Sequence, residues 1–275
     1  MKLTLRTKLF IKKVCLSTAL FLVFGCSLNV PEKHFKLGEE YFLQGQFKRS
    51  VEEYSKVIEI EPKKRMALTA LDRIAEIQRN KLKDPANAIV ALRRKFNLSN
   101  EADSKIGTLR LIADIYREDL EDPRKAAEEY QKIYNEFGLE TNDADQIILN
   151  FAEVLKEAQM FSSAAIRYQE FLTKFPGHKL GPRAMLNMGT ALLSAGNLDK
   201  AQQELKKVND QFSGRAEYDS LVAESLFAMG NLFEEKDDLD RAIELYKLAS
   251  QAYPNPAVVE LKIKALEKRR KERNL

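Results

Sequence analysis

The chain has 275 residues, of which 31% are charged and 44% are hydrophobic. The charged share excludes a polytopic membrane protein, and the apolar share excludes a wholly disordered chain. Glycine and proline number only 11 and 8, well below average usage, which favours long helices over a turn-rich β architecture. The composition therefore indicates a helix-rich body with a large apolar interior.

The formal net charge of +4 arises at the two ends of the chain. Residues 1–25 contain five basic and no acidic side chains, and without them 40 basic residues face 41 acidic ones. Residues 260–275 hold seven basic and three acidic residues, so the body between the ends is mildly acidic. A nucleic-acid-binding domain would carry a basic face, so we expect no nucleic-acid partner.

The N-terminal segment predicts export and lipidation. Val14 to Gly25 is an apolar stretch too short to span a bilayer, which needs about 20 residues, and it reads as the core of a signal peptide. The end of this stretch, Val23-Phe24-Gly25-Cys26, resembles the lipobox of bacterial lipoproteins, with bulky Phe24 as the departure. The resemblance implies cleavage before Cys26 and acylation of that cysteine. An uncleaved anchor or a buried cysteine is the alternative.

This reading divides the N-terminus into a signal peptide at 1–25 and a lipidated tether at 26–33. Ser27 stands where an aspartate would favour retention in the inner membrane, so we expect an outer-membrane anchor with the body facing the periplasm. Cys15 would leave with the signal peptide. The mature chain would then have no disulfide, no cysteine-rich metal site and no thiol nucleophile.

A small residue followed four positions later by a large one recurs six times, at intervals of 37 to 41 residues. The small residues are Ser50, Ala88, Ala126, Ala164, Ala201 and Ala242, and the large ones are Tyr54, Leu92, Tyr130, Tyr168, Leu205 and Tyr246. Such a period is typical of repeat architectures. A second set of small residues precedes the first, at Gly38, Ala152, Gly189 and Gly230. Small residues facing each other let two helices cross closely.

At these positions the chain resembles a tetratricopeptide-repeat protein over almost all of its mature length. In the first copy the pattern includes Leu37-Gly38, Tyr41, Phe47 and Pro62, and copies four to six repeat it. The resemblance implies an all-α fold: a right-handed solenoid of about six helix-turn-helix repeats over 34–254, with a C-terminal capping helix. The cap falls in the basic segment 255–275, where Val259, Ile263 and Leu266 stand at helical spacing.

Copies two and three depart from this pattern but resemble each other. The stretches that begin at Leu71 and Leu109 align without gaps, and each has an Asp-Pro pair, Asp84-Pro85 and Asp122-Pro123, where a second helix opens. Their first-helix small residues, Ala75 and Ala113, are displaced by one position. We expect a longer turn between the two helices of these copies.

The sequence offers little that could perform catalysis. His34 and His178 lie far apart in the repeat order, so neither a metal pair nor a nucleophile-base arrangement is expected. No phosphate loop or zinc motif is present. The acidic run around Glu234 and Asp237 lacks the spacing of a calcium loop. We therefore predict no enzyme activity, no metal and no cofactor.

A tetratricopeptide solenoid has a concave surface lined by its first helices, and family resemblance places certain side chains there. They are Phe35, Glu39 and Phe42 in copy one; Leu149, Glu153 and Lys156 in copy four; Arg183, Leu186, Asn187 and Thr190 in copy five; and Glu224, Phe227, Asn231 and Glu234 in copy six. Leu149, Leu186 and Phe227 replace the lysines with which some family members clamp a terminal carboxylate. We expect this groove to receive an extended or helical protein segment with apolar anchors and basic flanks. The alternative is that its Phe and Leu only pack between repeats.

Two envelope families are similar. As a lipid-anchored repeat protein, the chain resembles the BamD family, which supports insertion of β-barrels into the outer membrane. That family usually has five repeats, whereas six are expected here. Residues 174–212 look more like the YbgF/CpoB family, which coordinates envelope constriction but is not lipid-anchored as a rule. A third reading is a tether whose basic C-terminal helix binds anionic lipid or cell-wall polymer. The partners expected are envelope proteins or peptides, with the membrane reached through Cys26, and the sequence leaves the oligomeric state open.

Overall fold

The structure is a computed structural model that describes residues 30–138, 141 and 143–273. The expected signal peptide at 1–25 and the first half of the tether, residues 26–29 with Cys26, lie outside the described residues, as do the last two residues of the chain. Residues 30–33 of the expected tether belong to the first described helix.

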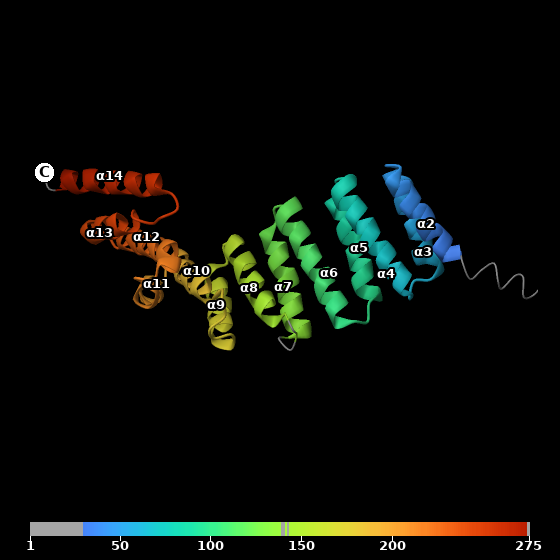
Figure 1. The fold of residues 1–275 in the computed structure, drawn as a ribbon, viewed down its shortest axis with the longest axis horizontal. Coiled ribbons are helices and arrows are strands. Elements are labelled where there is room, and N and C mark those ends of the chain that lie inside the picture. Colours follow the sequence, from blue (N-terminus) through green and yellow to red (C-terminus); the bar gives the residue numbers. More distant parts are fainter. Residues whose placement is uncertain (1–29, 139–140, 142, 274–275) are drawn as a thin grey trace, which may run out of the picture. The chain divides into compact units, whose positions relative to one another are not determined.

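The described residues form six successive helix-turn-helix repeats and a final helix, with no β-strand among them (Figure 1). In chain order the repeats consist of α2 (Val30–Leu43) and α3 (Phe47–Ile60), α4 (Arg65–Glu76) and α5 (Pro85–Leu98), α6 (Ala102–Asp114) and α7 (Pro123–Phe137), α8 (Ala144–Glu157) and α9 (Phe161–Lys174), α10 (Gly181–Ser194) and α11 (Leu198–Phe212), and α12 (Asp219–Glu235) and α13 (Leu239–Ala249). The final helix is α14 (Pro256–Arg273), and a short 3₁₀ helix, η3 (Ala216–Tyr218), precedes α12. The predicted all-α repeat solenoid with a C-terminal cap is confirmed.

The chain divides into two compact units, with Ile115 the last residue of the first and Tyr116 the first residue of the second. Unit 1 contains α2 to α6, and unit 2 contains α7 to α14. The division falls inside the third repeat, at the junction that follows α6. Nothing in the sequence pattern predicts this division, because the 38-residue period continues through it.

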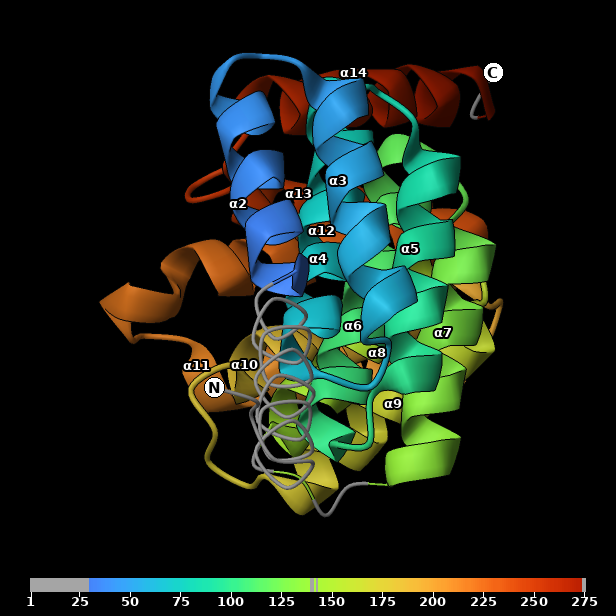
Figure 2. The same ribbon diagram turned by 90° about the vertical axis from the view of Figure 1, so that its right-hand side faces the viewer.

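Close approach of paired helices is the central packing feature of the repeats. In the first repeat, α2 and α3 run side by side (Figure 2), and the hydroxyl of Ser50 donates to the carbonyl of Gly38 at 2.7 Å. A Cβ atom on Gly38 would lie 2.8 Å from a ring carbon of Tyr54, closer than van der Waals contact allows. Small residues therefore meet across the crossing, and the large side chain fills the space beside them.

The same relation recurs in unit 2. A Cβ on Gly189 would lie 2.7 Å from Leu205, and one on Gly230 would lie 2.6 Å from Tyr246. Tyr54, Leu205 and Tyr246 are fully buried. The expected pairing of a small first-helix residue with a large second-helix residue is thus observed in three repeats.

A left-handed backbone residue ends the first helix of every pair. In these six turns φ lies between 50° and 75° at one residue, five positions before the small residue of the second helix; the residues are Gly45, Lys83, Glu121, Gln159, Gly196 and Asp237. The reversal lets the next N–H reach a carbonyl five residues back, as Gln46 does to Tyr41 at 2.8 Å. A non-glycine residue in this conformation costs about 1 kcal/mol, and four of the six positions carry one.

Repeats two and three accommodate their extra residue inside the first helix rather than in the loop. A π-helical turn follows α4 as η1 (Ile77–Lys81) and α6 as η2 (Ile115–Asp119). The N–H groups of Asp84 and Asp122 reach carbonyls six residues back, Gln78 at 2.8 Å and Tyr116 at 2.7 Å. The predicted longer connection is therefore a widened helical turn, and the carboxylates of Asp84 and Asp122 cap the next helices as the Asp-Pro motif suggested.

The final helix covers the sixth repeat. Val259 and Leu266 of α14 are buried in a cluster with Leu232, Phe233 and Ile243, and Ile263 packs against it. This contact removes from water the apolar side that a last repeat would otherwise expose. None of the described helices combines the length and the apolar character needed to cross a bilayer.

We expect Gly38→Ala to lower the free energy of unfolding by about 1–3 kcal/mol, because the added methyl must displace the buried Tyr54 ring. Gly107 lies in α6 of the same unit and has open space where a Cβ would stand. Gly107→Ala should therefore be neutral or stabilising by up to about 1 kcal/mol. Chemical denaturation followed by circular dichroism measures both. Equal effects of the two substitutions would contradict the close-crossing account.

Candidate functional site

Side chains from α8, α10 and α12 form a polar row on one side of unit 2, which we call the first-helix face. Asn187 of α10 donates to Glu153 of α8 at 2.7 Å, and Lys156 contacts the other oxygen of the same carboxylate at 2.9 Å. Arg183 of α10 contacts both oxygens of Glu224 of α12, at 2.5 and 3.1 Å. These contacts join successive repeats, so the row is preorganised and its charges are paired within the chain.

Buried tyrosines of the second helices support this face from below. Tyr246 donates to Asn231 at 2.6 Å and contacts Glu234 at 3.0 Å. Tyr168 is fully buried beneath the row, and its hydroxyl has no hydrogen-bond partner among the described residues. Burial, and then the neighbouring carboxylate of Glu153, raise the pKa of Tyr168 above its ordinary value. The phenol therefore stays neutral at physiological pH.

Two expected anchors pack into the protein instead of facing a groove. Leu186 is 2% exposed and lies in a core cluster with Leu205, Val208 and Leu221. Phe227 is half-buried between Tyr246 and Tyr253, with ring centroids 5.1 and 4.5 Å away. The sequence left two interpretations of these residues open: contact with a partner, or packing between repeats. Their positions fit packing between repeats better.

The remaining expected residues fall in two places. Leu149 and Thr190 are half-buried on α8 and α10, and the Thr190 hydroxyl donates to the carbonyl of Asn187 at 3.0 Å. The first-helix face belongs to unit 2, whereas Phe35, Glu39 and Phe42 lie on α2 in unit 1. There Glu39 accepts from Tyr54 at 2.6 Å and contacts Arg73 at 3.0 Å, which repeats the tyrosine-to-first-helix contact of unit 2.

Both histidines make local contacts. His34 contacts Glu53 at 2.6 Å. His178 accepts from the N–H of Leu180 at 3.1 Å and contacts Asp145 at 3.3 Å. No cluster of three or more potential metal ligands occurs within the described part of the chain.

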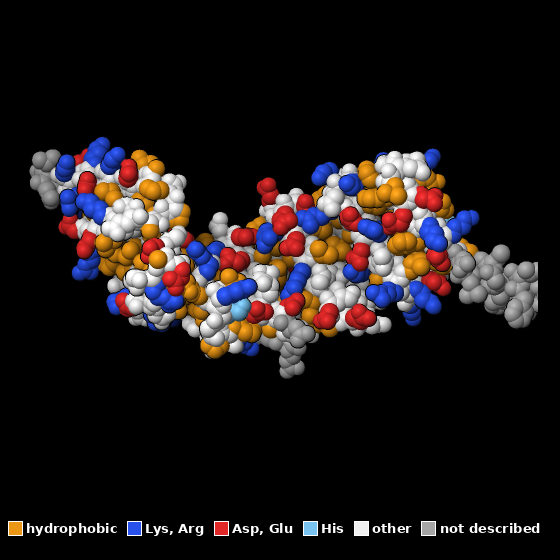
Figure 3. Space-filling model, viewed as in Figure 1, with side chains coloured by type: hydrophobic (Ala, Val, Ile, Leu, Met, Phe, Trp, Pro, Cys, Tyr) orange, Lys and Arg blue, Asp and Glu red, His pale blue; other side chains and the backbone are white. Residues whose placement is uncertain are grey.

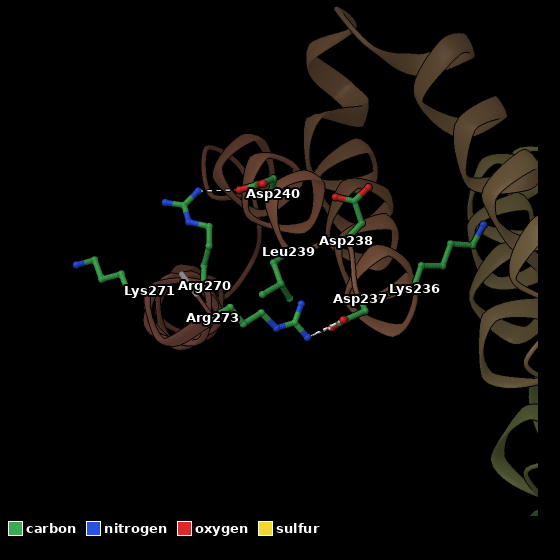
Figure 4. Close-up of a pocket in the computed structure, with 8 residues that line it drawn as sticks. All are labelled: Lys236, Asp237, Asp238, Leu239, Asp240, Arg270, Lys271 and Arg273. Atoms are coloured by element: carbon green, nitrogen blue, oxygen red, sulfur yellow. Dashed lines mark hydrogen bonds and ion pairs between the residues drawn. The ribbon is translucent and has the colours of Figure 1, made fainter. Parts of the chain in front are cut away.

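A cluster of ion pairs that the sequence reading missed joins the cap to the sixth repeat. The α12–α13 turn and the end of α14 line an open polar cleft of about 740 Å³. Arg273 contacts both carboxylate oxygens of Asp237 at 2.6 Å, and Arg270 contacts Asp240 at 2.8 Å (Figure 4). Arg269 also contacts Asp237, at 2.8 Å. We call these ion pairs of Asp237 and Asp240 with Arg269, Arg270 and Arg273 the clasp. The sequence contains both an acidic run and a basic tail, but it does not show that the two meet.

Comparisons with known proteins agree with this architecture. One tetratricopeptide-repeat family model matches residues 155–225, and another matches residues 34–64 and 223–256. These ranges include the first repeat and the last two, and omit 65–154, where the π-helical turns lie. The chain therefore contains tetratricopeptide repeats. No curated protein matches it.

Among solved structures, the chain is similar to YrrB, described as a TPR protein with an unusual peptide-binding site, with 16% identity, a TM-score of 0.53, and coverage of 77% of this chain and 97% of that one. A tetratricopeptide repeat protein from Parabacteroides merdae covers 87% of this chain and 99% of its own at 14% identity and a TM-score of 0.48. BtubC from P. vanneervenii gives 20% identity, a TM-score of 0.48 and coverages of 77% and 92%. At these identities the likeness to YrrB shows the fold alone.

The clasp predicts a pH dependence for the docking of α14. Hydrogen bonds from Arg273, with added positive charge from Arg269, lower the pKa of Asp237. A carboxylate with a lowered folded-state pKa contributes stability above its ordinary pKa, near 3.9, and loses it as the pH falls through the lowered value. We therefore expect protection of the α14 amides to be steady from neutral pH to about 5 and to fall below about 4.

Hydrogen-exchange protection factors of α14, with those of α11 as the internal reference, measure this effect. Asp237→Asn should reduce the protection of α14 at neutral pH and flatten its acid dependence. If α14 is equally protected in the unchanged protein and in Asp237→Asn at every pH, the clasp does not hold the cap.

Proposed function

We propose that this chain is a non-catalytic, lipid-anchored scaffold of the bacterial cell envelope, and that its first-helix face in repeats four to six captures a segment of a partner protein. The observation that carries the proposal is the polar row that links α8, α10 and α12. Tetratricopeptide folds are typically protein-interaction scaffolds, and YrrB, which has this fold, is described as having a peptide-binding site.

The paired charges of the row refine the partner that the sequence suggested. Glu153 and Glu224 are already neutralised by Lys156 and Arg183, so basic flanks of a partner must compete with side chains of this chain. Half-buried Asn187 and half-exposed Arg183 remain able to hydrogen-bond a peptide backbone or a carboxylate. We therefore propose a segment recognised mainly through hydrogen bonds, with apolar groups seated beside Leu149.

The envelope role rests on the sequence of the N-terminus. The lipobox-like Cys26 supports anchoring at the outer membrane with the body in the periplasm. A role in outer-membrane protein assembly, like that of the BamD family, fits a lipid-anchored repeat protein. The alternative is coordination of envelope constriction, like that of the YbgF/CpoB family, which residues 174–212 resemble.

Reversal of the Arg183–Glu224 pair tests partner capture. In Arg183→Glu two carboxylates face each other, whereas in the double variant Arg183→Glu with Glu224→Arg the ion pair is restored with opposite polarity. We expect both variants to capture the partner at least about tenfold more weakly, equivalent to about 1.4 kcal/mol. The reason is that the partner hydrogen-bonds the guanidinium at position 183, which both variants lack. The measurement is quantitative co-purification from solubilised envelopes with the tagged full chain.

The matched control is the exposed Lys206–Asp210 pair on α11, reversed in the same way, which should leave capture unchanged. Full recovery of capture in the Arg183–Glu224 double variant would assign this pair a purely structural role and contradict the proposal.

Lipidation is tested separately. When cells are supplied with labelled palmitate, the unchanged chain should incorporate label and pellet with membranes, and Cys26→Ala should lose the label. Incorporation that persists in Cys26→Ala, or that never occurs in the unchanged chain, would contradict the anchor.

A further inference from the structure

The basic side chains of α14 fall into two groups that face opposite ways. Four of them contact acidic residues of the sixth repeat: Lys262 contacts Glu234, Arg269 and Arg273 contact Asp237, and Arg270 contacts Asp240, all at 2.6 to 2.8 Å. These four hold the cap against the repeat. Their charge is neutralised within the chain.

The second group consists of Lys264, Lys268 and Lys271. Lys264 and Lys271 make no ion pair with any described residue, and Lys268 has only a 3.9 Å contact with Glu272. Lys271 lines the same cleft as Arg270 and Arg273. In Figure 4 its ammonium group points away from Asp237 and Asp240, whereas Arg270 and Arg273 contact these carboxylates.

Apolar side chains share the lysine side of the helix. Leu261 is 67% exposed and Val258 is 39% exposed. Steps of three and four residues lead from Leu261 to Lys264, Lys268 and Lys271, which places all of them on one side of a helix. Figure 3 shows hydrophobic side chains toward the start of α14 and basic ones toward its end. We call this surface, Ala257, Val258, Leu261, Lys264, Ala265, Lys268 and Lys271, the outer face of α14.

The outer face contains none of the buried residues of α14. The residues that anchor α14 to the core, Val259 and Leu266, lie on the opposite side of the helix. Viewed down the axis of α14, the described residues between the three lysines and Val258 include one acidic side chain, Glu272. On the other edge of the lysines stand Glu260 and Glu267, and Glu267 contacts Lys247 at 3.0 Å.

We infer that the outer face of α14 binds the surface of an anionic membrane. Lysines alone would suit any polyanion. An exposed leucine and valine beside them also suit an apolar phase, which the boundary between headgroups and acyl chains supplies. The lysine stems can lie along that boundary with their ammonium groups among the phosphates. This surface is independent of the first-helix face and of acylation at Cys26, so it goes beyond the proposed function.

The electrostatic part of the binding has a predictable size. A lysine near an anionic membrane surface contributes about 1 kcal/mol, which corresponds to about a fivefold change in partition. Lys268→Gln should therefore weaken partition into anionic vesicles about fivefold, and the triple Lys264→Gln, Lys268→Gln and Lys271→Gln variant about a hundredfold. The matched control Arg270→Gln removes the same charge from the clasp side and should have little effect.

The chain has no tryptophan, so Leu261→Trp in the full chain introduces a single fluorescent reporter into the outer face. Vesicles of phosphatidylcholine containing phosphatidylglycerol should shift its emission to the blue, and brominated acyl chains should quench it. High salt and omission of phosphatidylglycerol should each reduce both signals. The control reporter is Ile166→Trp on α9, which replaces a residue that is 59% exposed in the same unit. It should respond to neither.

Because both reporters carry the same N-terminal segment, insertion of that segment into the vesicles cannot explain a difference between them. No blue shift and no quenching at position 261, or an equal response at position 166, would overturn the inference. An equal response at position 261 to soluble polyglutamate would also overturn it, because the surface would then be a site for acidic chains rather than for a membrane.

Discussion

The structure depends on one type of contact between paired helices. The two helices cross at a small residue of the first helix, and a large side chain of the second helix packs directly over it. At Gly38, Gly189 and Gly230 there is no space for a methyl group, because Tyr54, Leu205 and Tyr246 occupy it. This contact fixes how closely each first helix lies to its second helix. It thereby fixes which side of the first helix remains available to a partner.

The first-helix face follows from that constraint. A tyrosine packed against a small residue also carries its hydroxyl to the surface side of the first helix, where it meets Glu39 in repeat one and Asn231 in repeat six. In unit 2 the polar side chains of successive first helices then contact one another, from Glu153 to Asn187 and from Arg183 to Glu224. The packing positions and the candidate binding positions are therefore parts of one arrangement.

The repeat spacing was sufficient to predict six helix pairs, the cap and the Asp-Pro helix starts, because each depends on residues close together in sequence. The π-helical turns of repeats two and three were not predictable in form, since an extra residue fits equally well in a loop or in a widened turn. Leu186 was expected to line the groove and is buried in the core, because a first helix presents residues both to a groove and to the next repeat, and the two sides are only a fraction of a turn apart. The clasp was missed because Asp237 and Arg273 are 36 positions apart and meet only when α14 folds back.

The central claim is that a partner meets this chain on the first-helix face of unit 2. Site-specific photo-crosslinking in intact cells tests it most directly, with the reactive amino acid in place of Lys156 on α8 or in place of Lys200, which is exposed on the second helix α11. The account predicts a discrete crosslinked product from position 156 and none from position 200. A product from position 200 alone, or equal products from both positions, would contradict it.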